Sequence, residues 1–404
     1  MVIGIIGAGA SGMAAAITAA QNADVKVLLF ERQARVGRKL LATGNGRCNL
    51  SNIHANMSHY HGGNPDFVAS ALDTFSSSET LRWFEDLGLY TVTEVNGKVY
   101  PYSDQANSVV DVLRFALERP NITILTGAEV LKARKTECGF TVETADCEYT
   151  CDALIIACGG LAGTKLGGSM AGYKLLRGFG HHATRLHPAL VQLKSSWNGC
   201  VSLKGVRTNC HAIIREKDAA VAEGTGELQF TEYGISGPLT FEISRDACCY
   251  PGDWCCVLDF LPGMDHEHLR MRLLRKKQSS QNCDELLTGI LHNRLGRVLC
   301  ATAGISGQKA ISEITDDEID RVITVVKGVV INLTEPLGMD AAQVTAGGII
   351  TSEFDPQTME SRLVQGLYAC GEVLDIDGEC GGYNLQWAWS SGRLAGLSAA
   401  GGIK

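Results

Sequence analysis

The chain has 404 residues, of which 45% are hydrophobic and 20% charged, so it can bury a large core and is not intrinsically disordered. Its net charge of -8 excludes a protein that coats nucleic acid through charge alone, because such binding needs many cations. Residues 1–22 carry no charged side chain, but glycines interrupt them and no basic residues precede them, which argues against a signal peptide or membrane span. We therefore expect a cytoplasmic protein with no membrane partner.

The 15 cysteines are scattered and form no CxxC motif. This spacing favours reduced, buried thiols over a disulfide framework or a zinc site. The segment His266-Glu267-His268 is a weak indication of a metal site, and the start of a solvated helix explains it equally well. We expect no bound metal, and the sequence leaves the oligomeric state open.

A nucleotide-binding pattern opens the chain. It consists of a buried strand at residues 2–6, an alanine-rich helix at 13–21 and a second strand at 25–30. In the GxGxxG motif between the first strand and the helix, Gly7 permits a tight turn, Gly9 lets a pyrophosphate approach the main chain, and Gly12 lets helix and sheet pack closely. Amides near Ser11 then face the phosphates. Glu31, at the tip of the second strand, can accept the ribose hydroxyls of an unphosphorylated adenosine, as in FAD or NAD.

The next stretch, residues 32–52, is basic, rich in glycine and without a clean period. Such a loop suits the wrapping of an anionic ligand, with Arg38, Lys39 and Arg47 near phosphates. An exposed basic loop is the alternative interpretation. The GxGxxG motif does not say which dinucleotide is bound.

The carboxyl-terminal end also has a strand, a glycine loop and a helix. Residues 364–372 predict a short strand that runs into Gly-Glu, residues 375–382 a glycine-rich loop, and residues 383–400 a helix with Asn384 as its N-cap. In a flavoprotein this helix start would face the flavin edge where negative charge develops on reduction. The alternative is a terminal helix that only closes the core.

The two ends of the chain differ from its middle. Residues 152–160 form another strand that runs into glycines, so strands typical of a parallel sheet occur towards both ends. Residues 191–260 contain short alternating runs that predict an antiparallel β unit, and residues 266–329 have a helical period. These patterns predict one α/β domain assembled from both ends around an insertion. The basic run at 270–277 is either a solvated helix face or a contact for an anionic partner such as RNA.

Together these segments resemble the BaiN-like (YhiN-like) family of FAD-dependent oxidoreductases, within the glutathione-reductase-type FAD superfamily. The matching segments are IIGAGASGMAAA from Ile5, GRKLLATGNGRCNLSN from Gly37, IIACGG from Ile155, HPALVQL from His187, FTEYGISGP from Phe230, VTAGGI from Val344 and GLYACGEVLDIDGECGGYNLQWAWSSGRLAG from Gly366. The resemblance implies an α/β fold with a Rossmann-like FAD-binding domain at 1–188 and 344–404. It further implies an inserted β-rich, barrel-like substrate domain at 189–262 and a helical subdomain at 263–343.

The resemblance also implies which residues meet FAD. By region of the cofactor, they are Gly7, Gly9, Ser11 and Gly12 at the pyrophosphate; Glu31 at the adenosine ribose; Arg32, Arg38 and Lys39 along the nucleotide half; Val130 at the adenine, through its backbone; Cys158 and Gly159 near the dinucleotide; Gly371 and Glu372 at the ribityl-phosphate portion; Asn384 and Leu385 at the flavin ring; and Asn45, Arg47, Cys48 and Asn49 around the flavin. We interpret Cys48 as a packing residue rather than a redox partner, because no resolving cysteine lies nearby in the sequence.

The chain has no second strand-GxGxxG-helix unit, so we expect no dedicated NAD(P)H domain. NADH or NADPH would then bind transiently as the reductant. Tyr233, His187 and Tyr383 are candidate proton donors, and each is equally well explained as a structural hydrogen-bonding residue. Glu232-Tyr233 departs from the family pattern, which often has a histidine before the GISGP segment.

Four functions fit this sequence. The first is reduction, or formation, of a carbonyl-conjugated C=C bond in a small organic substrate such as a steroid-like enone, as the named branch of the family implies. The second is synthesis of dihydrouridine in large-subunit ribosomal RNA, an activity that the family includes. The third is an amine oxidase that uses O2, and the fourth is a non-catalytic flavin-binding protein. The first is our leading hypothesis.

Overall fold

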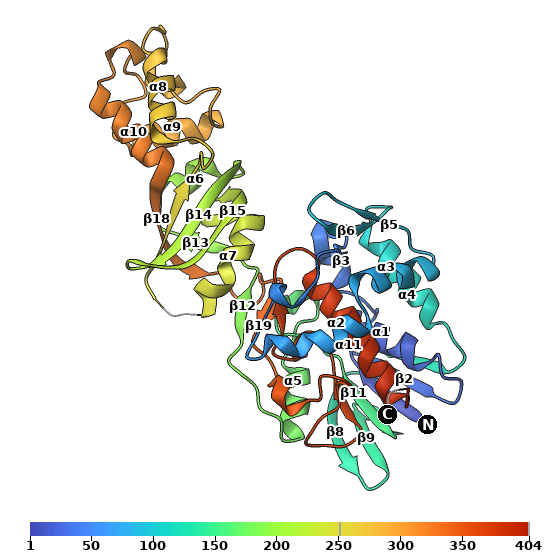
Figure 1. Cartoon of the computed structure of the whole chain (residues 1–404). Helices are drawn as coiled ribbons and strands as arrows, with labels where there is room; N and C mark the ends of the chain where they lie inside the picture. Colours follow the sequence, from blue (N-terminus) through green and yellow to red (C-terminus); the bar gives the residue numbers. More distant parts are fainter. Residues whose placement is uncertain (250–251, 403–404) are drawn as a thin grey trace. The chain divides into compact units, whose positions relative to one another are not determined.

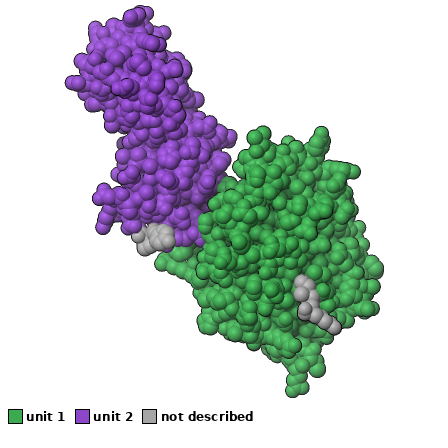
Figure 2. Space-filling view, in the orientation of Figure 1, with its two compact units in different colours: residues 1–187, 343–404 green, residues 188–342 purple. Residues whose placement is uncertain are grey.

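The computed structural model describes residues 1–249 and 252–402 and divides into two compact units (Figure 2). Unit 1 comprises residues 1–187 and 343–404, and unit 2 comprises residues 188–342. Unit 1 is therefore built from both ends of the chain, and unit 2 is an insertion between them.

A parallel sheet of five strands forms the centre of unit 1 (Figure 1). In spatial order the strands are β20 (Leu367–Ala369), β11 (Ala153–Ile156), β1 (Val2–Ile6), β2 (Lys26–Glu31) and β7 (Ile122–Thr126). Ile6 of β1 lies level with Phe30 of β2 and with Ile156 of β11. Ile156 in turn lies level with Ala369 of β20. The carboxyl ends of strands from both ends of the chain therefore meet at one edge of the sheet.

Helices α1 (Ala10–Ala19) and α11 (Tyr383–Ala399) approach each other closely, with little space between their backbones. A Cβ added to Gly392 would collide with the carbonyl oxygen of Ser11, and one added to Gly396 would collide with that of Ala15. Glycine at these two positions of α11 therefore permits the contact. The first and last helices of the chain pack into one core as a result.

The remaining elements of unit 1 surround this core. The helices are α2 (Ala69–Thr74), α3 (Ser77–Asp86), α4 (Ala106–Leu117) and α5 (Ala171–Gly178). One antiparallel sheet contains β8 (Val130–Thr136), β9 (Gly139–Thr144) and β10 (Glu148–Cys151), and a second contains β3 (Ser51–Asn52), β5 (Thr91–Thr93) and β6 (Lys98–Pro101). Strands β4 (Tyr60–His61) and β21 (Asp377–Gly378) pair antiparallel, which brings the segment around residue 60 beside the loop that precedes α11. Strand β12 (His187–Ala189) begins where the chain leaves unit 1, and β19 (Val344–Ala346) where it returns.

Unit 2 contains a closed barrel of six strands. In spatial order the strands are β13 (Leu193–Ser195), β16 (Gly234–Ser236), β15 (Ala219–Thr231), β14 (Arg207–Glu216), β17 (Trp254–Asp259) and β18 (Val329–Pro336). Burial alternates along β14, where Cys210, Ala212 and Ile214 are buried and the residues between them are more exposed. This period of two places one face of each strand inside the barrel.

The helices of unit 2 are α6 (Gly199–Leu203), α7 (Pro238–Cys249), α8 (His266–Lys276), α9 (Asn293–Thr302) and α10 (Asp316–Gly328). Three of them, α8, α9 and α10, lie between β17 and β18 in the sequence, where the helical period predicts them. Helices α6 and α7 differ from the prediction, because the alternating runs in residues 191–260 predict strands alone. The predicted fold class, an α/β domain from both chain ends with a barrel-like and a helical insertion, is confirmed.

Two features, a helix that could span a membrane and a group of side chains that could hold a metal ion, are absent from the part of the chain that the structure describes. Within residues 1–249 and 252–402, no helix combines the length and the apolar character needed to cross a bilayer. In the same ranges, no group of three or more His, Cys, Asp or Glu side chains is placed to hold a metal ion. His266 and His268 lie in the first turn of α8, where Asp265 caps the helix by accepting the His268 amide at 2.8 Å.

Candidate functional site

The turn between β1 and α1 presents main-chain amides at the edge of the sheet. Gly7 has a φ of +105°, and a Cβ there would meet the carbonyl oxygen of Ala157 at 2.5 Å. A Cβ at Gly12 would collide with the carbonyl oxygen of Gly7. A Cβ at Gly9, in contrast, would meet no atom within 4 Å, and no side chain caps α1. The helix therefore starts beside open space with uncapped amide donors, an arrangement that suits a phosphate group.

Glu31 ends β2 beside this turn. Its carboxylate accepts hydrogen bonds from the amides of Ala8, at 3.0 Å, and Gln33, at 2.7 Å. A main-chain bond of 3.0 Å from the Ala128 amide to the Glu31 carbonyl oxygen attaches the segment that leads into β8, where Val130 is buried. The two residues predicted at the ribose and the adenine, Glu31 and Val130, thus belong to connected segments beside the α1 turn.

Further predicted residues follow the neighbouring strands. Cys158 and Gly159 come shortly after β11, and the Cys158 thiol donates to the Ile6 carbonyl oxygen at 3.4 Å. Gly159 has a φ of +70°, and a Cβ there would meet no atom within 4 Å. Gly371, after β20, lies so close to α1 that an added Cβ would be 2.6 Å from the Ser11 hydroxyl oxygen. The parallel register therefore gathers these residues at the edge that carries the GxGxxG turn.

Lys39 and Glu372 connect the two chain ends through an ion pair of 2.9 Å across 333 residues. The second oxygen of Glu372 accepts the Thr345 amide at 2.8 Å. The Glu372 carboxylate is therefore held at both oxygens, and it holds Lys39 against the carboxyl-terminal loop.

The three predicted arginines have protein partners. Arg32 donates to a main-chain carbonyl oxygen at 2.9 Å, and Arg38 is exposed and donates to a glutamine side chain at 2.6 Å. The Arg47 guanidinium pairs with Glu94 at 3.1 Å and lies 4.0 Å from the centroid of the Tyr100 ring. Arg47 is therefore held by the hairpin of β5 and β6.

The loop before β3 carries the other residues predicted around the flavin. Asn45 is exposed with a φ of +56°, and Cys48 is fully buried with a φ of +64°. Burial raises the pKa of the Cys48 thiol to about 11, so the thiol is protonated at neutral pH. Among the described residues, the buried Asn49 Oδ1 has no hydrogen-bond partner, and it lies 2.9 Å from where a Cβ on Gly382 would be. Asn49 therefore presents an unpaired acceptor beside the start of α11.

Helix α11 begins after Gly382, which has a φ of +103°, and no side chain caps it. Asn384, predicted as the N-cap, is instead the second helical residue, so this prediction is wrong. Its side chain turns back onto Gly378, accepting from the amide at 2.8 Å and donating to the carbonyl oxygen at 2.6 Å. The Asn384 side chain thus closes the loop and does not cap the helix. The main-chain amides of Asn384 and Leu385 are therefore available at the helix start.

These features fit FAD at both of its ends. The uncapped start of α1 and the open side of Gly9 suit a pyrophosphate. At the start of α11, uncapped amides lie beside the unpaired acceptor of Asn49. A flavin edge carries both an N–H group and carbonyl oxygens, so it can satisfy both kinds of group.

The three candidate proton donors lie in different places. Tyr383 is buried in the first turn of α11, next to Asn384. His187 begins β12 and is partly buried in unit 1. Tyr233 lies in unit 2 between β15 and β16, where its hydroxyl donates to Gln192 Oε1 at 2.8 Å. Of the three, Tyr383 is the one adjacent to a residue predicted at the flavin.

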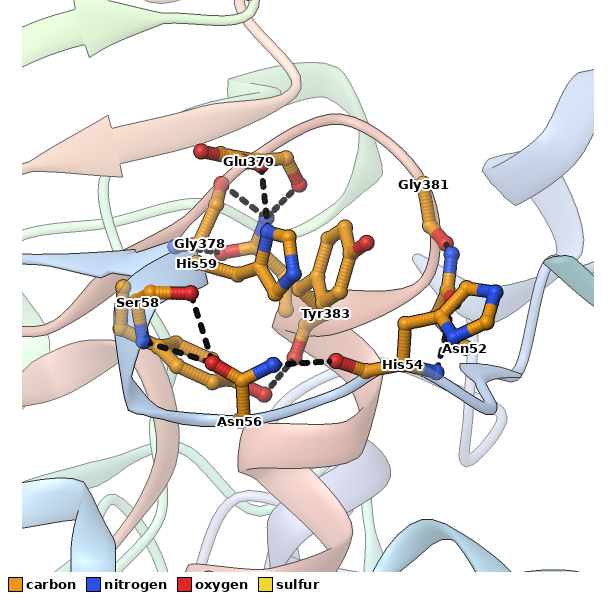
Figure 3. Close-up of polar contacts among 11 residues, drawn as sticks. Asn52, His54, Asn56, Ser58, His59, Gly378, Glu379, Gly381 and Tyr383 are labelled. Carbon is orange, nitrogen blue, oxygen red and sulfur yellow. Dashed lines mark hydrogen bonds and ion pairs between the residues drawn. The ribbon is translucent and has the colours of Figure 1, made fainter. Parts of the chain in front are cut away.

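The structure also brings together residues that the sequence did not single out. His59 Nδ1 and Glu379 Oε2 are 2.8 Å apart, although 320 residues separate them, and the His59 ring stacks on Tyr383 (Figure 3). Glu379 lies in the matching segment that starts at Gly366, whereas His59 lies in none of the matching segments, and their proximity depends on the pairing of β4 with β21. No local sequence signal could have identified this pair.

The parallel sheet and the uncapped helix start after the GxGxxG turn are typical of a dinucleotide-binding, Rossmann-type domain. A family model described as HI0933-like protein Rossmann domain matches residues 1–398. The chain belongs to this family and is an FAD-dependent oxidoreductase, which confirms the family predicted from the motifs.

Two curated relatives are similar over nearly their whole length. A 3-dehydro-bile acid delta(4,6)-reductase of Clostridium scindens is 42% identical, and the match covers 98% of this chain and 98% of the relative. A ribosomal RNA dihydrouridine synthase of Escherichia coli is 34% identical over 96% of this chain and 95% of the relative. Among solved structures, a 3-ketosteroid delta1-dehydrogenase of Sterolibacterium denitrificans has a TM-score of 0.52 at 12% identity, with 99% of both chains covered. This last likeness concerns the fold.

Proposed function

We propose that this enzyme reduces a carbonyl-conjugated C=C bond in a small organic substrate, such as a steroid-like enone. The observation that carries the proposal is the 42% identity, over 98% of both chains, to a reductase named for a 3-dehydro-bile acid. That match includes the inserted unit 2 as well as the FAD-binding unit 1. Identity to the dihydrouridine synthase of Escherichia coli is lower, at 34%.

Reduction of such a bond requires a hydride at one carbon and a proton at the neighbouring carbon. Reduced FAD supplies the hydride when it is bound. The tasks of the chain are to bind the nucleotide at the α1 turn, to hold the ring at the start of α11, and to deliver the proton. In this proposal the residues predicted at FAD act as binding residues, with Glu31 and the Gly9 turn at one end and Asn49 at the other.

We propose NADH or NADPH as the reductant. Within the described residues, the five-stranded parallel sheet of unit 1 carries one GxGxxG turn, and the barrel strands of unit 2 pair antiparallel. Neither sheet offers a second GxGxxG turn, so the nicotinamide cofactor would bind transiently, reduce the flavin and leave before the substrate binds.

Dihydrouridine synthesis in ribosomal RNA is the second candidate, because the reactive C=C bond of uracil is also conjugated to a carbonyl. The identity of 34% to the Escherichia coli synthase favours it. The basic run on α8 adds little support, since Arg270 pairs with Asp316 and Asp320, and Lys277 pairs with Asp316. Lys276 donates to two main-chain carbonyl oxygens. Cations that already have partners contribute less to phosphate binding.

Anaerobic half-reactions test this proposal. The FAD-loaded enzyme is reduced with NADH or NADPH, mixed with unsaturated 3-oxo steroids, and followed through the flavin absorbance. We expect enones to reoxidise the flavin and saturated analogues to leave it reduced. If no enone reoxidises the flavin, the proposal is contradicted. A loss of ribosomal RNA dihydrouridine on gene deletion would then support the second candidate, and peroxide release with simple amines would indicate an amine oxidase.

A further inference from the structure

We propose that His59 is the acid that delivers the proton and that Glu379 positions it, an inference that rests on the proposed function. His59 ends a short 3-10 helix (Met57–His59), and Glu379 lies in the loop before α11 (Figure 3). The Glu379 carboxylate can only accept, so at 2.8 Å it receives the hydrogen on His59 Nδ1. A main-chain bond of 3.0 Å from the Glu379 amide to the His59 carbonyl oxygen fixes the same pair. Two bonds therefore set the orientation of the imidazole.

The imidazole lies close to the expected flavin position. Its ring stacks on the Tyr383 ring with the centroids 4.3 Å apart and an interplanar angle of 17°. Tyr383 is the first residue of α11 and directly precedes Asn384, which we expect at the flavin ring. With Nδ1 engaged by Glu379, Nε2 is the nitrogen left to act, and among the described residues no partner occupies it.

Exposure favours His59 over Tyr383 as the proton donor. The His59 side chain is 26% exposed, so solvent can return a proton to it, whereas Tyr383 is 7% exposed. A group that must be reprotonated in every catalytic cycle needs access to solvent. The titratable groups that pack against the imidazole from other elements are Glu379, which accepts its Nδ1 hydrogen, and Tyr383, on which the ring stacks.

The loop that carries Glu379 does not depend on the imidazole for its shape. Tyr60 donates through its hydroxyl to the Tyr383 carbonyl oxygen at 3.0 Å, and Asn52 donates to the Gly381 carbonyl oxygen at 3.0 Å (Figure 3). The pairing of β4 with β21 and the three hydrogen bonds between Asn384 and the loop hold it as well. If the role of His59 were purely structural, these other contacts would therefore make it largely redundant.

The proposed step balances protons and electrons. Reduced FAD, held at the starts of α1 and α11, would supply a hydride, and with it both electrons, to the carbon β to the carbonyl. The N–H bond at Nε2 of the His59 imidazolium breaks, and its proton forms a C–H bond at the α carbon. The substrate gains two hydrogens, the imidazolium becomes a neutral imidazole, and solvent restores the proton. Glu379 positions the imidazole through Nδ1 without touching the substrate.

The first test compares His59→Gln with His182→Gln, which removes another histidine whose Nδ1 lies close to a glutamate, Glu353, at 2.7 Å. We expect His59→Gln to slow enone-driven flavin reoxidation by about 10²–10⁴-fold, the usual contribution of a general acid. Flavin content and reduction by NAD(P)H should stay near wild type in both variants, and His182→Gln should reoxidise at nearly the wild-type rate. An effect of His59→Gln below about threefold, or equal losses in both half-reactions with loss of flavin, overturns the proposal.

The second test needs no substrate. Imidazole ¹⁵N NMR signals of the FAD-loaded protein are compared in wild type and in Glu379→Gln. We expect Nδ1 of His59 in wild type to carry the hydrogen that the Glu379 carboxylate accepts, and we expect its signal to shift in Glu379→Gln. A His59 Nδ1 without a hydrogen, or a signal that is unchanged in Glu379→Gln, overturns the proposal. This result is independent of any enone, so a wrong substrate class and a wrong acid give different outcomes.

Discussion

The two helix starts that form the site are built in opposite ways. At α1, the contacts are main-chain contacts within one motif and its neighbouring strand, and a Cβ at Gly7 or Gly12 would meet carbonyl oxygens. At α11, the contacts come from the side chains of His59, Tyr60 and Asn52, which lie more than 300 residues earlier. The first start is specified by the absence of side chains. The second is specified by individual hydrogen bonds between distant segments.

This difference predicts the largest effect at Gly12. In Gly12→Ala the added Cβ collides with the Gly7 carbonyl oxygen, so we expect a loss of about 1–3 kcal/mol of stability and poor FAD retention. Gly9→Ala is the matched control, because its Cβ meets no protein atom within 4 Å. That variant should fold normally but should bind FAD more weakly than wild type. Thermal unfolding of the apoprotein and FAD titration measure the two effects, and equal stability of both variants would contradict the comparison.

At α11 a single side chain should matter next most. Asn384→Ala removes both hydrogen bonds to Gly378, and we expect a cost of about 1–3 kcal/mol because the freed main-chain groups are buried. Asn384→Asp keeps the acceptor and loses the donor, so it should fall between Asn384→Ala and wild type. Denaturant unfolding of the three proteins gives the order. A variant Asn384→Ala as stable as wild type would show that β4, β21 and Asn52 hold the loop without it.

Asn49 should affect binding and stability in opposite directions. In Asn49→Leu the unpaired buried acceptor disappears, so the apoprotein should be as stable as wild type or more stable. FAD affinity should fall about tenfold, the equivalent of one hydrogen bond of roughly 1.4 kcal/mol. FAD titration and unfolding of the apoprotein are measured on the same preparation. Unchanged FAD affinity would show that Asn49 does not meet the ring.

The smallest effect is expected at Cys48. With a pKa of about 11, its thiol should have a thiolate fraction of roughly one in a thousand at pH 8. Cys48→Ser should therefore turn over at close to the wild-type rate, and native Cys48 should react slowly with iodoacetamide. Reactivity should rise with pH towards 11, which mass spectrometry of the labelled peptide can follow. Rapid labelling at pH 7 would contradict the burial of the Cys48 thiol.

Local patterns predicted the first elements of the chain well. The strand, GxGxxG turn, helix and second strand are contiguous, so their period and glycine spacing define β1, α1 and β2 without help from the rest of the chain. The alternating run in β14 likewise indicated an antiparallel strand. The N-cap prediction at Asn384 was wrong, because the choice between Gly382 and Asn384 depends on which loop the asparagine closes.

The sequence by itself determined the class of fold, the GxGxxG turn and the family, because each is recognised from segments whose own residues are close together in the chain. The tertiary structure alone decided that His59 meets Glu379, that Lys39 meets Glu372, and that Arg270 and Lys277 pair with carboxylates of α10. These contacts join segments tens to hundreds of residues apart, and strand pairing and helix packing create them. Local propensity carries no information about such pairs. The proposed proton donor, His59, could therefore be recognised only in the folded chain.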